Sequence, residues 1–219
     1  MQNEKANSRT SSDAAHVKAP GLRKMIERGL ARLHYWIFDR ILGGQMFRHE
    51  AEAHGTFTAV CYGPDGKEKW RNVFPNVVTT VGKNLALDTY LEGSSYTVTG
   101  PYMGLISSGS YSAVDAADTM ASHAGWLEAG NANAPTYTSP RKTAAWSAAS
   151  SGSKALSAAL SFSFTGSGTV KGCFLVYGSG AVTTIDNTSG VLYSAGLFTG
   201  GDKTVASGDT LAVSYTASL

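Results

Sequence analysis

The stretch LSFSFTGSGTVKGCFLVY, residues 160–177, decides the fold of this chain. From Leu160 to Phe164 every second residue is apolar and the residues between are serines, which is the period of a β-strand with one buried face. The Gly-Ser-Gly at 166–168 is a turn signal, and residues 169–177 continue as a largely apolar run. The stretch therefore predicts two strands joined by a tight turn.

Short runs of the same kind lie on both sides of this stretch. They are bounded by Gly, Ser, Pro or Asp, the residues that favour turns. The further predicted strands are 56–62, 67–74, 101–106, 191–198, 204–205 and 211–215. The first two form a hairpin around the turn at 63–66, with Phe57, Ala59 and Cys61 on one face. The pattern predicts a mainly β chain, an antiparallel β-sandwich or jelly-roll-like module.

A short helix interrupts this series of strands. The segment GKNLALDTYLE, residues 82–92, predicts a helix with Gly93 at its C-terminal cap. We expect Leu85, Tyr90 and Leu91 to face inward from this helix.

The least regular part of the chain is residues 107–153, which is rich in Ser and Ala. A long loop in a compact domain is usually functional or part of an interface. We expect Trp126 and Trp146 to anchor the loop on the sheet. These two tryptophans and Tyr137 are also the candidate contacts between the loop and a ligand or partner.

The N-terminal residues differ in character from the rest. Residues 1–19 are polar and predict an extended arm, and Pro20 then opens an amphipathic basic helix that ends at Gly43-Gly44. The candidate interface residues on this helix are Leu22, Met25, Ile26, Arg28, Leu33, Trp36, Ile37 and Arg40. The helix either docks on a neighbouring subunit or packs on its own β domain. We therefore expect an arm and helix over 1–54 and a β module over 55–219.

Charge is scarce and unevenly placed. Charged residues are 16% of the chain, against roughly 25% in soluble domains, and a surface covered in an assembly tolerates this better than a free one. Residues 1–72 carry 12 of the 18 Lys and Arg but only 8 of the 16 Asp and Glu. A solvated basic helix face explains this excess better than nucleic acid does. The sequence predicts neither a membrane span nor an export signal, so we expect synthesis in the cytoplasm.

No metal or cofactor site is expected. The two histidines and two glutamates within 49–54 form a loose cluster, but their spacing matches no metal pattern closely. The phosphate-loop spacing G-x-x-x-x-G-K-[ST] does not occur. Cys61 and Cys173 fall inside predicted strands, which favours two buried thiols over a disulfide.

We also expect no enzymatic activity and no catalytic residues. Asp118, His123 and a serine could form a nominal triad, but no G-x-S-x-G context supports it. Asp115, Asp118 and Glu128 could line a carboxylate site, yet acid/base pairs need environments that sequence does not show. A turn-capping role for Asp118 is the favoured interpretation.

Several segments occur in an order that resembles a known group of proteins. The segments are 76–84 (NVVTTVGKN), 102–106 (YMGLI), 118–119 (DT), 125–126 (GW), Arg141, 171–175 (KGCFL), 192–198 (LYSAGLF) and 207–211 (SGDTL). The series resembles small structural proteins of tailed bacteriophages, which are head-associated or tail-fibre proteins. The resemblance covers residues 55–219, and its motifs are specific as a series and weak singly. It implies a virion protein with no catalytic residues.

The resemblance implies a minor capsid or decoration protein located in the virion. Its arm and helix would bind neighbouring capsid or tail subunits, and it would self-associate, for example as a trimer. The expected mechanism is burial of apolar surface between chains together with β-edge pairing. One alternative is a short-tail fibre or a fibre anchor. Another is a carbohydrate-binding host-adhesion module, whose Trp and Tyr side chains in the 107–146 loop would stack on a host glycan.

Overall fold

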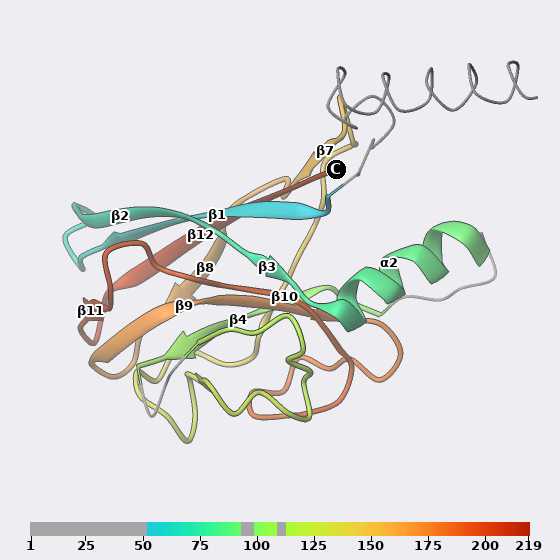
Figure 1. The fold of residues 1–219 in the computed structure, drawn as a ribbon. Coiled ribbons are helices and arrows are strands. Elements are labelled where there is room, and N and C mark those ends of the chain that lie inside the picture. Colours follow the sequence, from blue (N-terminus) through green and yellow to red (C-terminus); the bar gives the residue numbers. More distant parts are fainter. Residues whose placement is uncertain (1–51, 93–98, 109–112) are drawn as a thin grey trace, which may run out of the picture. The chain divides into compact units, whose positions relative to one another are not determined.

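The computed structural model describes residues 52–92, 99–108 and 113–219 (Figure 1). The chain divides into two compact units, 1–50 and 51–219, and the described residues belong to the second. The predicted arm and basic helix, with all their candidate interface residues, lie outside the described residues.

The described chain is mainly β and contains two antiparallel sheets. The first sheet consists of β1 (His54–Tyr62), β2 (Glu68–Pro75), β7 (Ser153–Ala155), β8 (Leu160–Ser163) and β12 (Thr210–Ser218). Its order is β2-β1-β12-β7, and β8 pairs with the first half of β12 while β7 pairs with the second half. The hairpin predicted from the turn at 63–66 is confirmed as β1 and β2.

The second sheet holds the strand pair predicted from the opening stretch and its neighbours. It consists of β3 (Val77–Val78), β4 (Tyr102–Ser107), β5 (Leu127–Glu128), β6 (Lys142–Thr143), β9 (Gly168–Tyr177), β10 (Val191–Leu197) and β11 (Lys203–Val205). Its central order is β3-β10-β9-β4-β5. The predicted strands 160–164 and 169–177 form β8 and β9, but they lie in different sheets. The tight turn therefore joins the two layers of a sandwich-like architecture.

The sheets face each other across one apolar core (Figure 1). Phe57, Ala59 and Cys61 of β1 point into this core and are fully buried, as predicted. Phe57 stacks on Phe74 with ring centroids 5.2 Å apart, and its centroid lies 4.6 Å from that of Tyr215. Each large apolar side chain buried in this way stabilises the fold by about 1.5–3 kcal/mol.

The second sheet is buried on both of its faces. Phe174 and Val176 of β9 belong to a second apolar cluster, which Met120 and Trp126 of the 107–153 segment also join. The intervening residues of β9 belong to the core between the sheets. A strand covered on both faces needs a continuous apolar run, which is why β9 does not alternate. The long irregular segment therefore acts as a covering layer over the sheet.

The helix α2 (Thr80–Glu92) follows β3 directly. Thr79 caps it, because its hydroxyl oxygen accepts a hydrogen bond from the Gly82 N–H at 3.0 Å. Gly82 lies so close to the Tyr193 backbone that a Cβ would collide with it. The helix therefore packs tightly on β10 through its first turns. Leu85 is buried as expected. The expectation that Tyr90 and Leu91 also face inward is wrong, because both side chains are exposed.

Loop segments cover the outer edges of the first sheet. The Thr138 N–H donates to the Ser163 carbonyl at 2.9 Å, and the Ser147 N–H donates to the Ala155 carbonyl at 3.0 Å. On the opposite edge, side chains of β2 bond to the backbone of segment 199–204. Covered edges are a usual protection against strand addition. The edges of the first sheet are therefore less open to β-edge pairing than bare edges would be.

Candidate functional site

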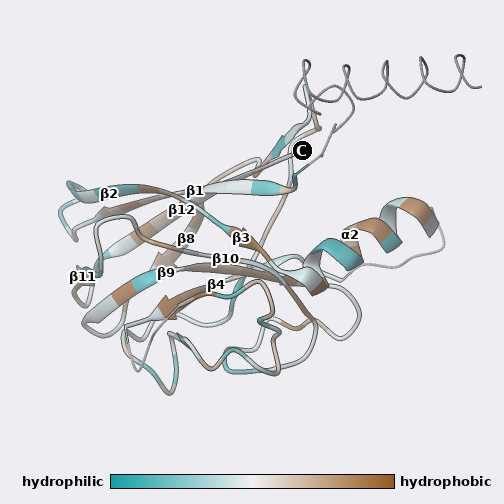
Figure 2. Cartoon of the chain, viewed as in Figure 1, coloured by the Kyte–Doolittle hydropathy of each residue, from teal (hydrophilic) through white to brown (hydrophobic). Residues whose placement is uncertain are grey.

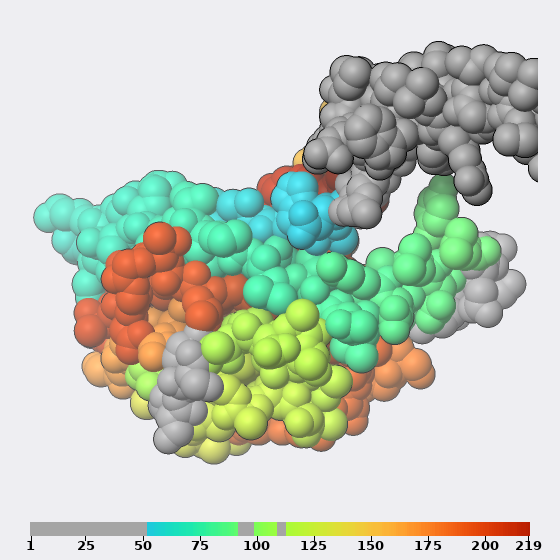
Figure 3. All heavy atoms as spheres, viewed as in Figure 1, coloured from blue at the N-terminus to red at the C-terminus, as the bar shows by residue number. Residues whose placement is uncertain are grey.

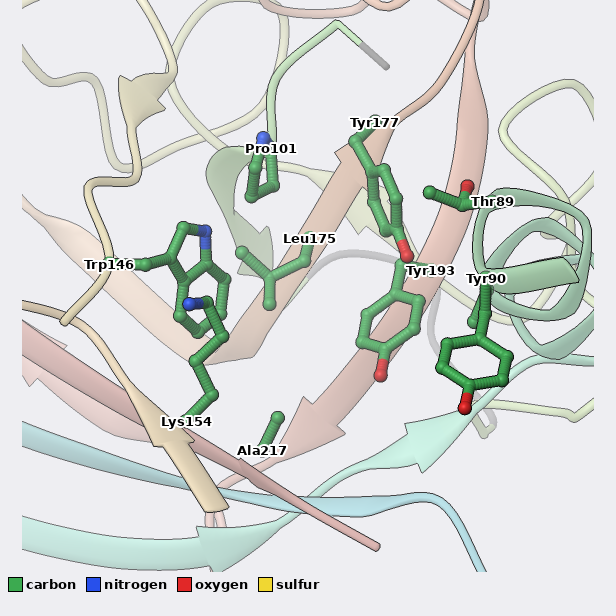
Figure 4. Close-up of a pocket in the computed structure, with 10 residues that line it drawn as sticks. Thr89, Tyr90, Pro101, Trp146, Lys154, Leu175, Tyr177, Tyr193 and Ala217 are labelled. Carbon is green, nitrogen blue, oxygen red and sulfur yellow. The ribbon is translucent and has the colours of Figure 1, made fainter. Parts of the chain in front are cut away.

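An aromatic cavity of about 580 Å³ opens between the two sheets beside α2 (Figure 4). Both sheets, α2 and two loop residues line it. The side chains that dominate its wall are Tyr90, Trp146, Lys154, Leu175, Tyr177 and Tyr193. Cavities of roughly 300–1,000 Å³ hold drug-sized ligands, so this one can also accommodate several apolar side chains.

The rings of the cavity are held by contacts with one another and with the core. Tyr177 and Tyr193 lie in a tilted arrangement with centroids 5.1 Å apart, and Trp146 meets the buried Tyr215 edge-on at 6.0 Å. Figure 4 shows Trp146 on one side of the cavity, with Tyr177 and Tyr193 across from it and Leu175 between. Burial raises the pKa of Tyr193, so that its hydroxyl stays neutral. The cavity therefore offers aromatic faces and neutral hydroxyls to whatever enters it.

The cavity mouth adjoins an apolar ridge on the outer side of α2. Leu87 is 56% exposed, Tyr90 is 83% exposed and Leu91 is 73% exposed. Residues three and four apart lie on one side of a helix, so these three side chains form a continuous ridge. Figure 2 shows hydrophobic residues on α2, and Figure 3 shows α2 standing out from the rest of the β module. We refer to Leu87, Tyr90 and Leu91 as the α2 ridge.

A buried ion pair fixes the covering layer of the second sheet. Arg141 donates through Nε to Glu128 Oε1 at 2.8 Å and through Nη2 to Glu128 Oε2 at 2.6 Å. The same guanidinium binds the carbonyls of Val182 and Asn187, while the Asp186 N–H donates to Glu128 Oε2. Burial raises the pKa of Glu128, and the hydrogen bonds and charge of Arg141 oppose this rise. The network ties the 128–141 and 182–187 segments together.

A second carboxylate holds the turn before β12. Asp209 is 1% exposed and forms an ion pair with Lys69 of β2 at 2.5 Å. Its Oδ2 also accepts the Ala206 N–H at 2.8 Å. Burial pushes the pKa of Asp209 upward, but these hydrogen bonds and the charge of Lys69 outweigh burial and bring it below its usual value. The pair therefore has the character of a turn anchor.

The residues proposed as a nominal triad act instead as supports for Trp126. The Trp126 Nε1–H donates to Asp118 Oδ2 at 3.0 Å, and the His123 ring stacks on the indole at 3.9 Å. Asp118 also accepts the Asp115 N–H, which matches its predicted turn-capping role. Trp126 is fully buried and anchors the loop, as expected.

Two of the candidate loop contacts need correction. Trp126 and Tyr137 are only 0% and 3% exposed, so their rings are enclosed by the covering layer and the core and offer no face for stacking on a glycan. Trp146 is half-buried and lines the cavity. It is the one of the three that a ligand or partner can reach.

The structure bears on the other chemical predictions only in part. Of the cluster expected within 49–54, the described residues include Glu52 and His54, and His54 Nδ1 lies 2.9 Å from the Glu52 carbonyl. Within the described ranges, no group of three or more His, Cys, Asp or Glu side chains is arranged to hold a metal ion. Cys61 and Cys173 are both buried free thiols, as predicted. No helix among the described residues is long and apolar enough to cross a membrane.

Sequence reasoning missed most of the residues that line the cavity. Tyr177 is the last residue of β9 and Tyr193 lies within β10, so only the pairing of these two strands brings the two rings together. Lys154 lies in a short strand that no pattern indicated. Tyr90 did carry a signal, because the segment around it is apolar on more than one side of the helix, which is typical of a helix covered on both sides.

Comparisons with protein families, with curated proteins and with solved structures found no match to this chain.

Proposed function

We propose that the chain is a structural component of a tailed-phage virion, a minor capsid or decoration protein. Its β module would sit on the shell, and its N-terminal part would bind neighbouring subunits. The resemblance carried by segments within 55–219 supports the phage assignment. The assembly role rests on one observation, the α2 ridge beside the aromatic cavity. Exposed apolar surface is unfavourable in water, and contiguous patches of this kind mark interaction sites.

The internal chemistry of the module agrees with a structural role. Three buried charged side chains, Glu128, Arg141 and Asp209, form hydrogen bonds with the backbone of loops. Glu128 also pairs with Arg141, and Asp209 pairs with Lys69. These contacts hold the loops between strands in place. The buried polar groups thus fix loops, while the α2 ridge is an exposed apolar surface.

The proposal extends to the connectivity and the oligomeric state. The first and last strands, β1 and β12, are neighbours in one sheet, as a jelly-roll arrangement requires. In a jelly roll, consecutive strands alternate between the two sheets. The β1–β2 hairpin departs from this pattern, because both of its strands lie in the first sheet. We infer a jelly-roll-like module that self-associates.

Two other functions follow from the same features. A short-tail fibre or fibre anchor would use the N-terminal part for attachment and present the β module outward. A host-adhesion module would use Trp146, Tyr177 and Tyr193, since aromatic faces stack on sugar rings. The adhesion function predicts glycan binding that Trp146→Ala removes, and a β module without glycan affinity would rule it out.

The decisive experiment is the copy number of the chain relative to the major capsid protein, measured by quantitative mass spectrometry of purified particles. A ratio near that of the shell protein supports the decoration role. A few copies per particle would move the protein to the tail or to one vertex. Complete absence from particles would refute the virion proposal.

A truncation tests the role of the N-terminal part separately. We expect a chain lacking residues 1–44 to keep a folded β module and to be missing from particles, because the basic amphipathic segment is the predicted attachment. Circular dichroism checks the fold, and mass spectrometry of particles checks incorporation. Normal incorporation of the truncated chain would contradict the assigned role.

A further inference from the structure

The α2 helix has apolar surface on two opposite sides. One side, with Gly82 and Leu85, is buried against the module. The other side is the α2 ridge, which is more than half exposed at each of its three residues. A surface helix normally pairs one apolar face with one polar face, and a helix that is apolar on both is normally covered on both. The ridge is thus the surface of α2 for which a covering partner is needed.

The ridge and the aromatic cavity adjoin at Tyr90. Tyr90 belongs to both, because it forms part of the ridge and also lines the cavity. A protrusion next to a hollow is self-complementary under a two-fold axis, since the rotation places each protrusion over the hollow of the other copy. This adjacency favours a second copy of the same chain over an unrelated partner.

The charges around this surface agree with such a pairing. Asp88 follows Leu87 directly and is exposed on the helix, while Lys154 is exposed on the cavity wall. If the ridge of one copy entered the cavity of another, Asp88 would lie on the side of the inserted helix and Lys154 on the wall that receives it. A two-fold axis would repeat this opposition of charge on both sides of an apolar centre.

The available area also suits a dimer. Tyr90 alone, at 83% exposure, offers on the order of 150 Å². The two leucines and the cavity wall extend this to a patch of a few hundred Å², the scale that marks interaction sites. A standard interface buries about 800 Å² on each partner, with an apolar centre and a polar rim. The ridge and cavity can supply that centre.

We propose that two copies of this chain associate about a two-fold axis through α2, with Leu87 and Leu91 of each copy inserted into the aromatic cavity of the other. This deepens the assembly function and rests on it. Trp146, Tyr177 and Tyr193 then form the socket, and Leu175 forms its floor. The cavity is a protein-binding socket in this arrangement.

The first test is sedimentation equilibrium of the full chain and of two variants. Wild type should dimerise, and Leu91→Glu should weaken association at least tenfold because it places a charge in an apolar socket. Val73→Glu is the matched control, since Val73 is 54% exposed but lies on β2 and does not line the cavity. It should dimerise like wild type. A monomeric wild type, a trimer, or an oligomer that Leu91→Glu leaves unchanged would overturn the proposal.

The second test locates the contact by disulfide cross-linking. Full-length Leu91→Cys protein is mixed with Lys154→Cys protein under mild oxidation, and we expect a cross-linked heterodimer. Cys61 and Cys173 are buried and do not compete. A mixture of Val73→Cys with Lys154→Cys is the control and should give no cross-link. Equal cross-linking in both mixtures would contradict the arrangement. The copy number in particles stays a separate readout, so a dimer absent from particles would refute only the virion proposal.

Discussion

Replacing Arg141 by methionine tests how the covering layer is held. The substitution removes both hydrogen bonds to Glu128 and those to the carbonyls of Val182 and Asn187. It leaves the Glu128 carboxylate, which is 5% exposed, with the Asp186 N–H as the one remaining partner of this network. Breaking a buried ion pair by removing one partner costs about 3–5 kcal/mol. We expect a loss of that size in the free energy of unfolding, against typical stabilities of about 5–15 kcal/mol.

The assay is equilibrium urea unfolding followed by tryptophan fluorescence, because Trp126 reports on the covering layer. Arg71→Met is the matched control, since Arg71 forms an ion pair with Glu68 that is about half exposed on both sides. Exposed pairs contribute about 0–1 kcal/mol, so this variant should stay close to wild type. A loss below 1 kcal/mol for Arg141→Met, equal to the control, would refute the reasoning.

Two further measurements separate the ion pair from simple loss of packing. In Arg141→Met the pKa of Glu128 should rise further, because burial already raises it and the opposing guanidinium is gone. The folded carboxyl then binds a proton more tightly than the unfolded one, so stability falls as pH rises and the loss should be smaller at pH 5 than at pH 8. Adding Glu128→Leu should recover about 0.5–3 kcal/mol, the usual coupling of contacting residues. A loss that is independent of pH would indicate a packing effect.

Three more predictions follow from the burial of single side chains. Phe174→Ala should destabilise by about 3–5 kcal/mol in the same assay, because the ring is fully buried against Trp126; a negligible loss would contradict this packing. Lys69→Met should raise the pKa of Asp209, because the ion pair with Lys69 helps to lower it. Wild type loses the stability contributed by Asp209 only as pH falls through this lowered pKa, and the variant should lose it at a higher pH. An unchanged pH dependence of the urea midpoint would contradict this. Burial raises the pKa of Cys61 to about 11, so neither it nor Cys173 should react with a thiol reagent until urea unfolds the chain.

The strands were predictable because their signal is local. Alternation in 56–62 and the turn at 63–66 depend on neighbours in sequence, and both are found in the β1–β2 hairpin. The covering layer was predictable only through its Trp126 anchor, because the other apolar residues of 107–153 are widely spaced and acquire a common role only when they meet β9. Tyr90 and Leu91 were assigned inward on the assumption that an apolar helix residue faces its own core. Their exposure shows that a sequence alone does not distinguish a buried apolar helix residue from an exposed one.

The position of α2 links these results to the proposed function. The Thr79 cap and the close approach of Gly82 to β10 fix the first turn of the helix, and the ridge continues from that turn on the same helix. A rigid apolar surface loses little conformational entropy on association, which favours binding over the same residues on a mobile loop. An exposed apolar surface carries a cost in solvation that a bound partner removes. The proposed assembly in a particle would supply such a partner.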